Sequence, residues 1–119
     1  MFIIHYFNSV KLWKLSNMES PVQTFQGHVG IVWDVSWNSV AVDVFASASN
    51  DQTVQIWDVR EEESTISLPT TDSALSLDWH PNLEYLVSVG LENGSILTYD
   101  IRASPSAPLS TMVRNVLPF

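Results

Sequence analysis

Apolar and polar residues alternate in short runs along most of this 119-residue chain. The run from Val10 to Leu15 is typical, because an apolar side chain at every second position gives a strand one buried face. Similar runs are separated by turn residues, as in successive short strands. They predict strands at 10–15, 22–25, 31–37, 44–49, 53–57, 65–68, 73–79, 83–89, 95–99 and 109–112. Residues 113–119 look like the start of one more strand.

The run of strands repeats along the chain. Trp37 and Trp79 are 42 residues apart, and so are Trp57 and Tyr99. An earlier, partial copy ends at Trp13, 44 residues before Trp57. A period of about 40 to 45 residues with several short strands is the signature of a repeated, blade-like sheet.

Two dipeptides bracket the best-preserved copy: Gly27-His28 precedes its first strand, and Trp57-Asp58 ends its third. This arrangement resembles the WD40-repeat family over residues 10 to 119. The resemblance implies an all-β fold, a partial WD40 β-propeller of about two and a half four-stranded blades. Because a closed propeller needs roughly four to eight blades, the chain is expected to be a fragment of a larger one.

The repeat divides the chain as follows: the end of one blade at 10–26, a complete blade at 27–69, a degenerate blade at 70–112 and the start of another at 113–119. Residues 1–9 do not fit the repeat and form a non-repeat N-terminal segment. A divergent strand is the alternative interpretation. The apolar opening lacks the basic region and cleavage site of a signal peptide.

WD40 blades often contain a buried hydrogen-bonded set, and the resemblance carries it over to this chain. The matching residues are His28, Ser47 or Ser49, Asp51 and Trp57. A buried imidazole and carboxylate must be paired, because an unsatisfied one costs about 1–3 kcal/mol. A hydrolase triad is the competing interpretation, but no GxSxG elbow is present and the serines lie inside a predicted strand.

The following blade has lost this set. At the same 42-residue spacing it has other residues: Thr70, Val89, Leu91, Asn93 and Tyr99. Replacing a whole polar network by apolar groups can be nearly neutral. We therefore expect this blade to be held together by packing.

Trp33 and Asp34 are candidate partner-binding residues. They lie at the head of a predicted inner strand, a region that borders the docking face in WD-repeat proteins. Tryptophan is enriched among interface hot spots. Burial between blades is the alternative.

A third group consists of Asp58 with Arg60 and Asp100 with Arg102. The Trp-Asp-x-Arg pattern looks like the box by which substrate receptors dock on a cullin-type ubiquitin ligase. A local Asp–Arg pair at the end of a strand explains the same residues structurally.

The later part of the chain is also similar to methylosome WD-repeat subunits, which are obligate cofactors of a type II protein arginine methyltransferase. The stretches that carry this resemblance are 76–81 and 92–95. It implies a substrate-presenting scaffold in the cytoplasm and nucleus, with proteins as partners.

Composition narrows the other possibilities. The formal charge is −8, so the chain lacks the basic surface with which a protein binds nucleic acid or an anionic membrane. No apolar stretch has membrane-spanning length. There is no cysteine, and His80 lies in a turn without companion ligands. We expect no enzyme activity, cofactor, metal or small-molecule substrate.

Overall fold

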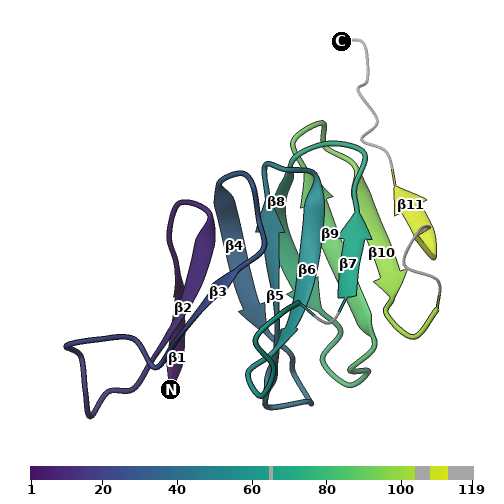
Figure 1. The fold of residues 1–119 in the computed structure, drawn as a ribbon. Coiled ribbons are helices and arrows are strands. Elements are labelled where there is room, and N and C mark those ends of the chain that lie inside the picture. The colour runs from purple at the N-terminus through teal and green to yellow at the C-terminus, as the bar shows by residue number, and fades with distance from the viewer. Residues whose placement is uncertain (65, 104–107, 113–119) are drawn as a thin grey trace, which may run out of the picture.

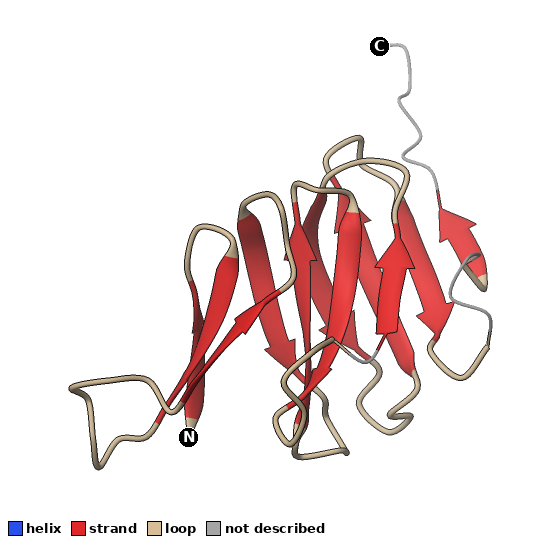
Figure 2. Ribbon diagram, in the orientation of Figure 1, coloured by secondary structure: helices blue, strands red, loops and turns tan. Residues whose placement is uncertain are grey.

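The computed structural model describes residues 1–64, 66–103 and 108–112. Within these ranges the chain is all-β, with eleven strands joined by turns and loops (Figure 2). The strands form three antiparallel sheets that stand one after another along the molecule (Figure 1). In this part of the chain there is no helix that is long and apolar enough to cross a membrane.

Each sheet is built from strands that are consecutive in the chain. The first sheet contains β1 (Phe2–His5), β2 (Ser9–Trp13) and β3 (Gln23–Gln26). The middle sheet contains β4 (Val32–Trp37), β5 (Val44–Ser49), β6 (Thr53–Asp58) and β7 (Ile66–Pro69). The third sheet contains β8 (Ala74–Trp79), β9 (Leu86–Leu91), β10 (Ile96–Asp100) and β11 (Ser110–Met112). Such successive meanders, packed face to face, are the blades of a partial β-propeller.

The predicted strands of the two complete sheets are confirmed, with small shifts at their ends. The largest shift is in β9, which begins at Leu86 instead of residue 83. The turn before it is longer than expected because the His80 Nδ1 atom accepts hydrogen bonds from the amides of Asn82 and Leu83, both at 3.1 Å. Asn38 closes the equivalent turn of the middle sheet with its Oδ1 atom.

The N-terminal segment contains a strand. β1 pairs with β2, with Phe2 opposite Trp13, as Phe45 lies opposite Trp57 in the middle sheet. Residues 2–5 therefore form a strand that diverges in sequence from the repeat, which was the alternative interpretation of this segment. Such a strand can form because main-chain pairing does not need the side chains of the repeat. The boundary at residue 10 stays a prediction, and the predicted strand at 113–119 lies outside the described residues.

Two apolar cores lie between the sheets. The core between the first and middle sheets contains the buried residues Val10, Leu12, Phe25, Val32, Phe45 and Trp57. The core between the middle and third sheets contains Ala46, Ala48, Val54, Ile56, Leu68, Ala74, Trp79, Val87, Val89, Leu91, Leu97 and Tyr99. Each sheet is thus held mainly by its neighbour, as expected for repeats that cannot bury an apolar face alone.

Candidate functional site

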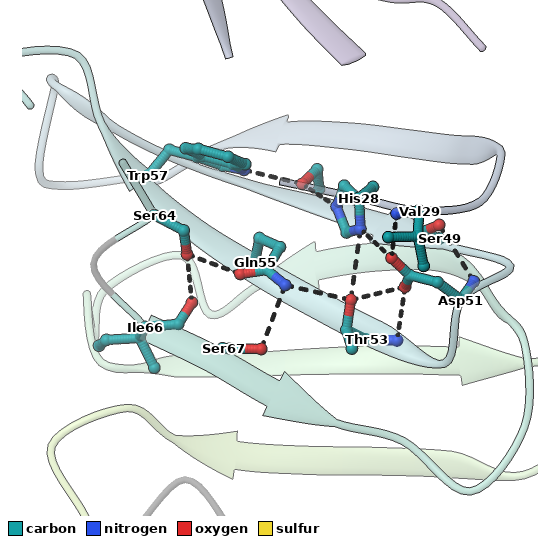
Figure 3. A network of polar contacts seen from close by, with 11 residues as sticks. His28, Val29, Ser49, Asp51, Thr53, Gln55, Trp57, Ser64, Ile66 and Ser67 are labelled. Atoms are coloured by element: carbon teal, nitrogen blue, oxygen red, sulfur yellow. Dashed lines mark hydrogen bonds and ion pairs between the residues drawn. The ribbon is translucent and has the colours of Figure 1, made fainter. Parts of the chain in front are cut away.

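A chain of hydrogen-bonded polar side chains, buried at Ser47 and His28, runs across β5 and β6 of the middle sheet to Ser67 on β7 (Figure 3). His28 Nδ1 lies 2.9 Å from Asp51 Oδ2, and His28 Nε2 lies 2.6 Å from Ser47 Oγ. Trp57 Nε1 donates to the same Ser47 oxygen at 2.8 Å. The structure thus brings four of the five predicted residues of this set into one hydrogen-bonded network.

With a neutral His28 ring, the partners of the network fix the direction of each hydrogen bond. The Asp51 carboxylate can only accept, so His28 Nδ1 carries the hydrogen that it receives. In the neutral imidazole, Nε2 is then an acceptor and takes the hydroxyl hydrogen of Ser47, whose oxygen accepts from Trp57. Every group in the network is satisfied by this single arrangement, which locks the relative positions of the loop before β4 and the strands β5 and β6.

Ser49 does not contact the tryptophan and has a different role from Ser47. Its Oγ accepts from the Asp51 amide at 3.1 Å and so holds the turn between β5 and β6. The sequence offered either serine as the partner of the tryptophan, and the geometry selects Ser47.

Further residues in this region had not been singled out from the sequence. Thr53 donates to Asp51 Oδ1 from its hydroxyl at 2.6 Å and from its amide at 3.0 Å. The Val29 amide donates to Asp51 Oδ2 at 3.0 Å. Gln55 continues the polar contacts to Ser64 and Ser67. The signal was present in the period-two pattern, because Thr53, Gln55 and Trp57 share one face of β6.

Burial raises the pKa of Asp51, but the hydrogen bonds from Thr53 and His28 outweigh it, so the net pKa lies below its ordinary value. The carboxylate therefore stays ionised in a site where its side chain is only 5% exposed. The His28 side chain beside it is 1% exposed.

The geometry gives this set a structural role. Ser47 is completely buried, and its oxygen is already engaged by both Trp57 and His28. A serine nucleophile must reach a substrate carbonyl next to an oxyanion hole, and a closed hydroxyl cannot do so. Within the described residues, no group of three His, Asp or Glu side chains lies where it could hold a metal ion.

The third sheet satisfies its polar groups differently. The Tyr99 hydroxyl, at the position of Trp57, donates to the carbonyl of Pro69, which ends β7 in the middle sheet. Thr70, at the position of His28, donates to the Asp72 carbonyl at 2.7 Å. Val89 is buried in the apolar core where the middle sheet has Ser47.

Trp33 and Asp34 lie together on β4 but have different surroundings. A β-bulge between Val32 and Asp34 turns Trp33 outward, and its side chain is 47% exposed. Asp34 Oδ2 accepts from the Leu77 amide of β8 at 2.9 Å and thus joins two sheets. The bulge recurs in β8, where Leu75 occupies the position of Trp33 and is 39% exposed. Leu75 had not been singled out from the sequence, since a bulge leaves no clear trace in the pattern.

Asp58 and Arg60 form a local ion pair where β6 ends, at the end of the middle sheet away from Trp33. Arg60 Nε and Nη2 donate to the two Asp58 oxygens at 2.9 and 2.6 Å. Hydrogen bonds from the Arg60 side chain hold the pKa of Asp58 below its ordinary value, and the pKa of Arg60 is raised. The Arg60 side chain is nevertheless 70% exposed.

Asp100 and Arg102 repeat this pair in the third sheet, at 3.1 and 2.8 Å. There the Arg102 guanidinium also lies 3.3 Å from the centroid of the Tyr85 ring. Asp43 occupies the position of Tyr85 in the middle sheet and lies 3.9 Å from Arg60. Both arginines are thus oriented by residues of the same chain.

A groove of about 780 Å³ lies between β3 and the loop that follows β6. Its wall on the loop side carries three consecutive glutamates, 61–63, and its other wall carries Gln23, Thr24 and Gln26. The side-chain Nε2 of Gln23 donates to the main-chain carbonyl of Glu61 at 3.1 Å across this groove.

Comparison with known proteins fits this architecture. Residues 19–58 match the family model described as WD domain, G-beta repeat. The matched range includes the Gly-His dipeptide, the buried polar set and β4 to β6. The fold is therefore a partial WD40 β-propeller, and the middle sheet contains its clearest WD40 repeat.

Several longer proteins are similar to this chain. It is 34% identical over 98 residues to dynein axonemal intermediate chain 4 of Mus musculus, covering 82% of this chain and 12% of that protein. It is 31% identical over 103 residues to Coronin-7 of Rattus norvegicus, covering 81% and 11%. It is 30% identical over 109 residues to histone acetyltransferase type B subunit 2 of Candida glabrata, covering 88% and 26%.

The chain thus spans about an eighth of the length of the dynein intermediate chains it matches. These relatives support a protein-interaction scaffold as the general role of the repeat.

Proposed function

We propose that this chain is part of a non-catalytic scaffold whose partner docks where the strands β4 and β8 begin. The observation that carries the proposal is the pair of outward-turned, bulged residues, Trp33 and Leu75, on two strands that contact each other. Exposed large apolar residues on a rigid support are typical of interface hot spots. The polar network beside them supplies the rigid support.

For the partner we propose a type II protein arginine methyltransferase, for which the chain acts as a substrate-presenting cofactor similar to methylosome protein 50. The support is the resemblance of residues 76–81 and 92–95, together with the charge of −8. The substrate tails of such an enzyme are rich in arginine, and the groove beside glutamates 61–63 has the opposite charge. Charge of this kind raises the association rate more than the final affinity. This role places the protein in the cytoplasm and nucleus.

The test is a capture experiment. The longest protein that contains this chain is immobilised, and its binding of a purified type II methyltransferase is measured. Trp33→Ala and Leu75→Ala should each weaken capture by about tenfold or more, as expected for hot spots. Val42→Ala is the matched control, because Val42 is 82% exposed in a turn at the other end of the middle sheet. Equal capture by all three variants would contradict the proposed docking surface.

The second candidate is a substrate receptor of a cullin-type ubiquitin ligase. One observation favours it: the Arg60 side chain is held in a fixed orientation by Asp58 and remains 70% exposed. Arg60→Ala should then abolish capture of the cullin adaptor and leave the fold intact. Arg102→Ala is the matched control, with the same local pair in the next sheet. Adaptor capture that depends on Arg60, without any methyltransferase, would replace the first candidate by this one.

A further inference from the structure

The strand β3 has an unpaired edge. It lies last in the strand order of the first sheet, as β7 does in the middle sheet, and among the described strands it pairs only with β2. The Leu12 carbonyl of β2 accepts from the Val22 amide at 2.7 Å, so Leu12 directs its main chain toward β3. Main-chain groups alternate in direction along an antiparallel strand. Gln23, opposite Leu12, therefore points back at β2, and Thr24 and Gln26 direct their main-chain groups to the unpaired edge.

The groove described above runs beside this edge. Its volume is about 780 Å³, and it is lined by Thr24 and Gln26 on the side of β3 and by residues 59–63 on the other side. Val22, which is 50% exposed, and Val59 give the groove an apolar part. The four residues of β3 span about 13 Å at roughly 3.3 Å per residue. The groove therefore has the length of a short extended peptide.

The loop side of the groove is acidic. It carries the three exposed glutamates at 61–63. Arg60 is the one basic side chain among the lining residues, and its guanidinium is paired with the two Asp58 oxygens at 2.9 and 2.6 Å. The groove thus has a net negative charge, and an occupant with basic side chains has the complementary charge. The apolar stems of such side chains can also pack on the two valines of the groove.

The glutamates lie on one side of β3. Leu12 is buried in the core that faces the middle sheet, and Gln23 lies opposite Leu12. The Gln23 side chain points to the same side, where its Nε2 atom donates to the Glu61 carbonyl. In an extended segment paired with β3, successive side chains point to opposite faces. Only every second side chain of that segment consequently faces the glutamates.

We propose that this groove binds an extended basic peptide, which pairs with the free edge of β3 and directs a basic side chain to glutamates 61–63 at every second residue. In strand addition, main-chain hydrogen bonds give the affinity and alternate side chains give the specificity. A segment in which arginine alternates with glycine fits this spacing. The inference deepens the proposed function, on which it rests for the source of the basic tail.

The first test compares two peptides on the unmodified protein. Binding is measured by fluorescence anisotropy with the longest protein that contains this chain. The probe is a labelled peptide in which arginine and glycine alternate, and its matched control has the same composition with all arginines grouped at one end. The alternating peptide should bind about tenfold more tightly, because only its spacing suits strand addition. Equal or tighter binding of the grouped peptide would overturn the proposal.

Two double variants with the same change in net charge locate the site. Glu62→Gln with Glu63→Gln removes two charges from the groove and should weaken binding of the alternating peptide about fivefold, as expected for two exposed ion pairs. Glu84→Gln with Glu92→Gln removes two exposed charges from turns of the third sheet and should leave the affinity unchanged. Equal weakening by both double variants would mean that the overall charge, and not the groove, attracts the peptide.

Thr24→Pro tests the strand edge. It removes the amide hydrogen that Thr24 directs to the groove, whereas Thr24→Ala removes the same side chain and keeps that hydrogen. Proline is tolerated on an unpaired edge, and circular dichroism checks the fold of both variants. The proline variant should bind the alternating peptide about fivefold more weakly than the alanine variant, the effect of one hydrogen bond. Equal binding by the two folded variants would contradict strand addition. The two peptides test the same point on the unmodified protein, so the result does not depend on the proline variant.

The peptide measurements contain no methyltransferase, so this inference and the proposed function can fail separately. Capture of the enzyme that depends on Trp33 and Leu75, without any preference for the alternating peptide, would overturn the inference and leave the proposed docking surface intact. A clear preference for the alternating peptide, without capture of the enzyme, would support the groove as a peptide site and contradict the proposed partner.

Discussion

The middle and third sheets have the same strand order, the same bulge and the same Asp–Arg pair, but they are stabilised by different interactions. In the middle sheet, a buried network joins His28, Ser47, Asp51 and Trp57. In the third sheet, the position of Ser47 is filled by Val89 and the position of Trp57 by Tyr99, both buried in the core.

This difference shows that the blade geometry does not depend on the polar network. A network whose members are all present, or all replaced, leaves no buried group unsatisfied, whereas a partial network does. The first sheet illustrates the partial case. Phe2 lies opposite Trp13 as Phe45 lies opposite Trp57, so Ile4 occupies the position of Ser47, and within the described residues the buried Trp13 Nε1 atom has no hydrogen-bond partner. The network is thus a cooperative unit, and a single substitution within it should be costly.

The largest effect is expected for Ser47→Val, which introduces the residue of the third sheet into the middle sheet. It removes the acceptor of Trp57 and the donor to His28 in a site with no solvent access. Two buried groups left unsatisfied should lower the free energy of unfolding by about 2–4 kcal/mol. Urea denaturation measures this. Ser49→Ala is the control and should cost about 1 kcal/mol, because it removes one turn hydrogen bond.

Asp51→Ala should have the next largest effect, about 1–3 kcal/mol, because it removes the nearer acceptor of His28 Nδ1 and leaves that nitrogen only the Thr53 hydroxyl, 3.3 Å away. Asn93→Ala in the third sheet should cost clearly less, since Asn93 Oδ1 holds a turn by accepting from the Ser95 amide at 2.9 Å. Equal losses in urea melts would show that the two sheets are stabilised alike.

Much of the fold could be predicted from the sequence because the alternation of apolar residues and the 42-residue period are strong, local signals. The members of the polar network could also be predicted from the sequence. The choice between Ser47 and Ser49 was not, because both lie on the same face of β5, two residues apart. Only the position of the tryptophan ring in three dimensions distinguishes them.

Features that depend on local backbone geometry could not be predicted. The bulges that turn Trp33 and Leu75 outward insert a residue without changing the composition of the strand. The strand β1 was hidden for a related reason, because its pairing uses main-chain groups and Ile4 stands where the repeat has serine. The Arg102–Tyr85 contact joins a strand end to a distant turn, and no spacing rule indicates it.

Tyr99→Phe tests the third sheet directly. It removes the hydroxyl that donates to the Pro69 carbonyl but leaves the ring in the core. The expected loss is about 0.5–1.5 kcal/mol, the net contribution of one ordinary hydrogen bond. Thermal melting measures this loss, with Thr98→Val as the control: Thr98 neighbours Tyr99 on β10, but its hydroxyl contacts Ser88 of β9 and not the Pro69 carbonyl. A loss as large as that of Ser47→Val would mean that the third sheet also depends on a polar unit.

The smallest effect is expected in the pH dependence of stability. The pKa of Asp51 is below its ordinary value in the folded chain, so folding favours the ionised form. Its contribution to stability is complete above the pKa of the unfolded chain and is lost as the pH falls towards the folded value. Asp51→Asn removes this titration, so the variant should be less stable near neutral pH and should lose less stability on acidification. Urea midpoints between about pH 6 and pH 3 measure the slope, since the ordinary aspartate pKa is about 3.9. Asn93→Asp is the control for an added carboxylate at the same position of the third sheet. Parallel slopes for the unmodified chain and Asp51→Asn would mean that the carboxylate is not held ionised by the network.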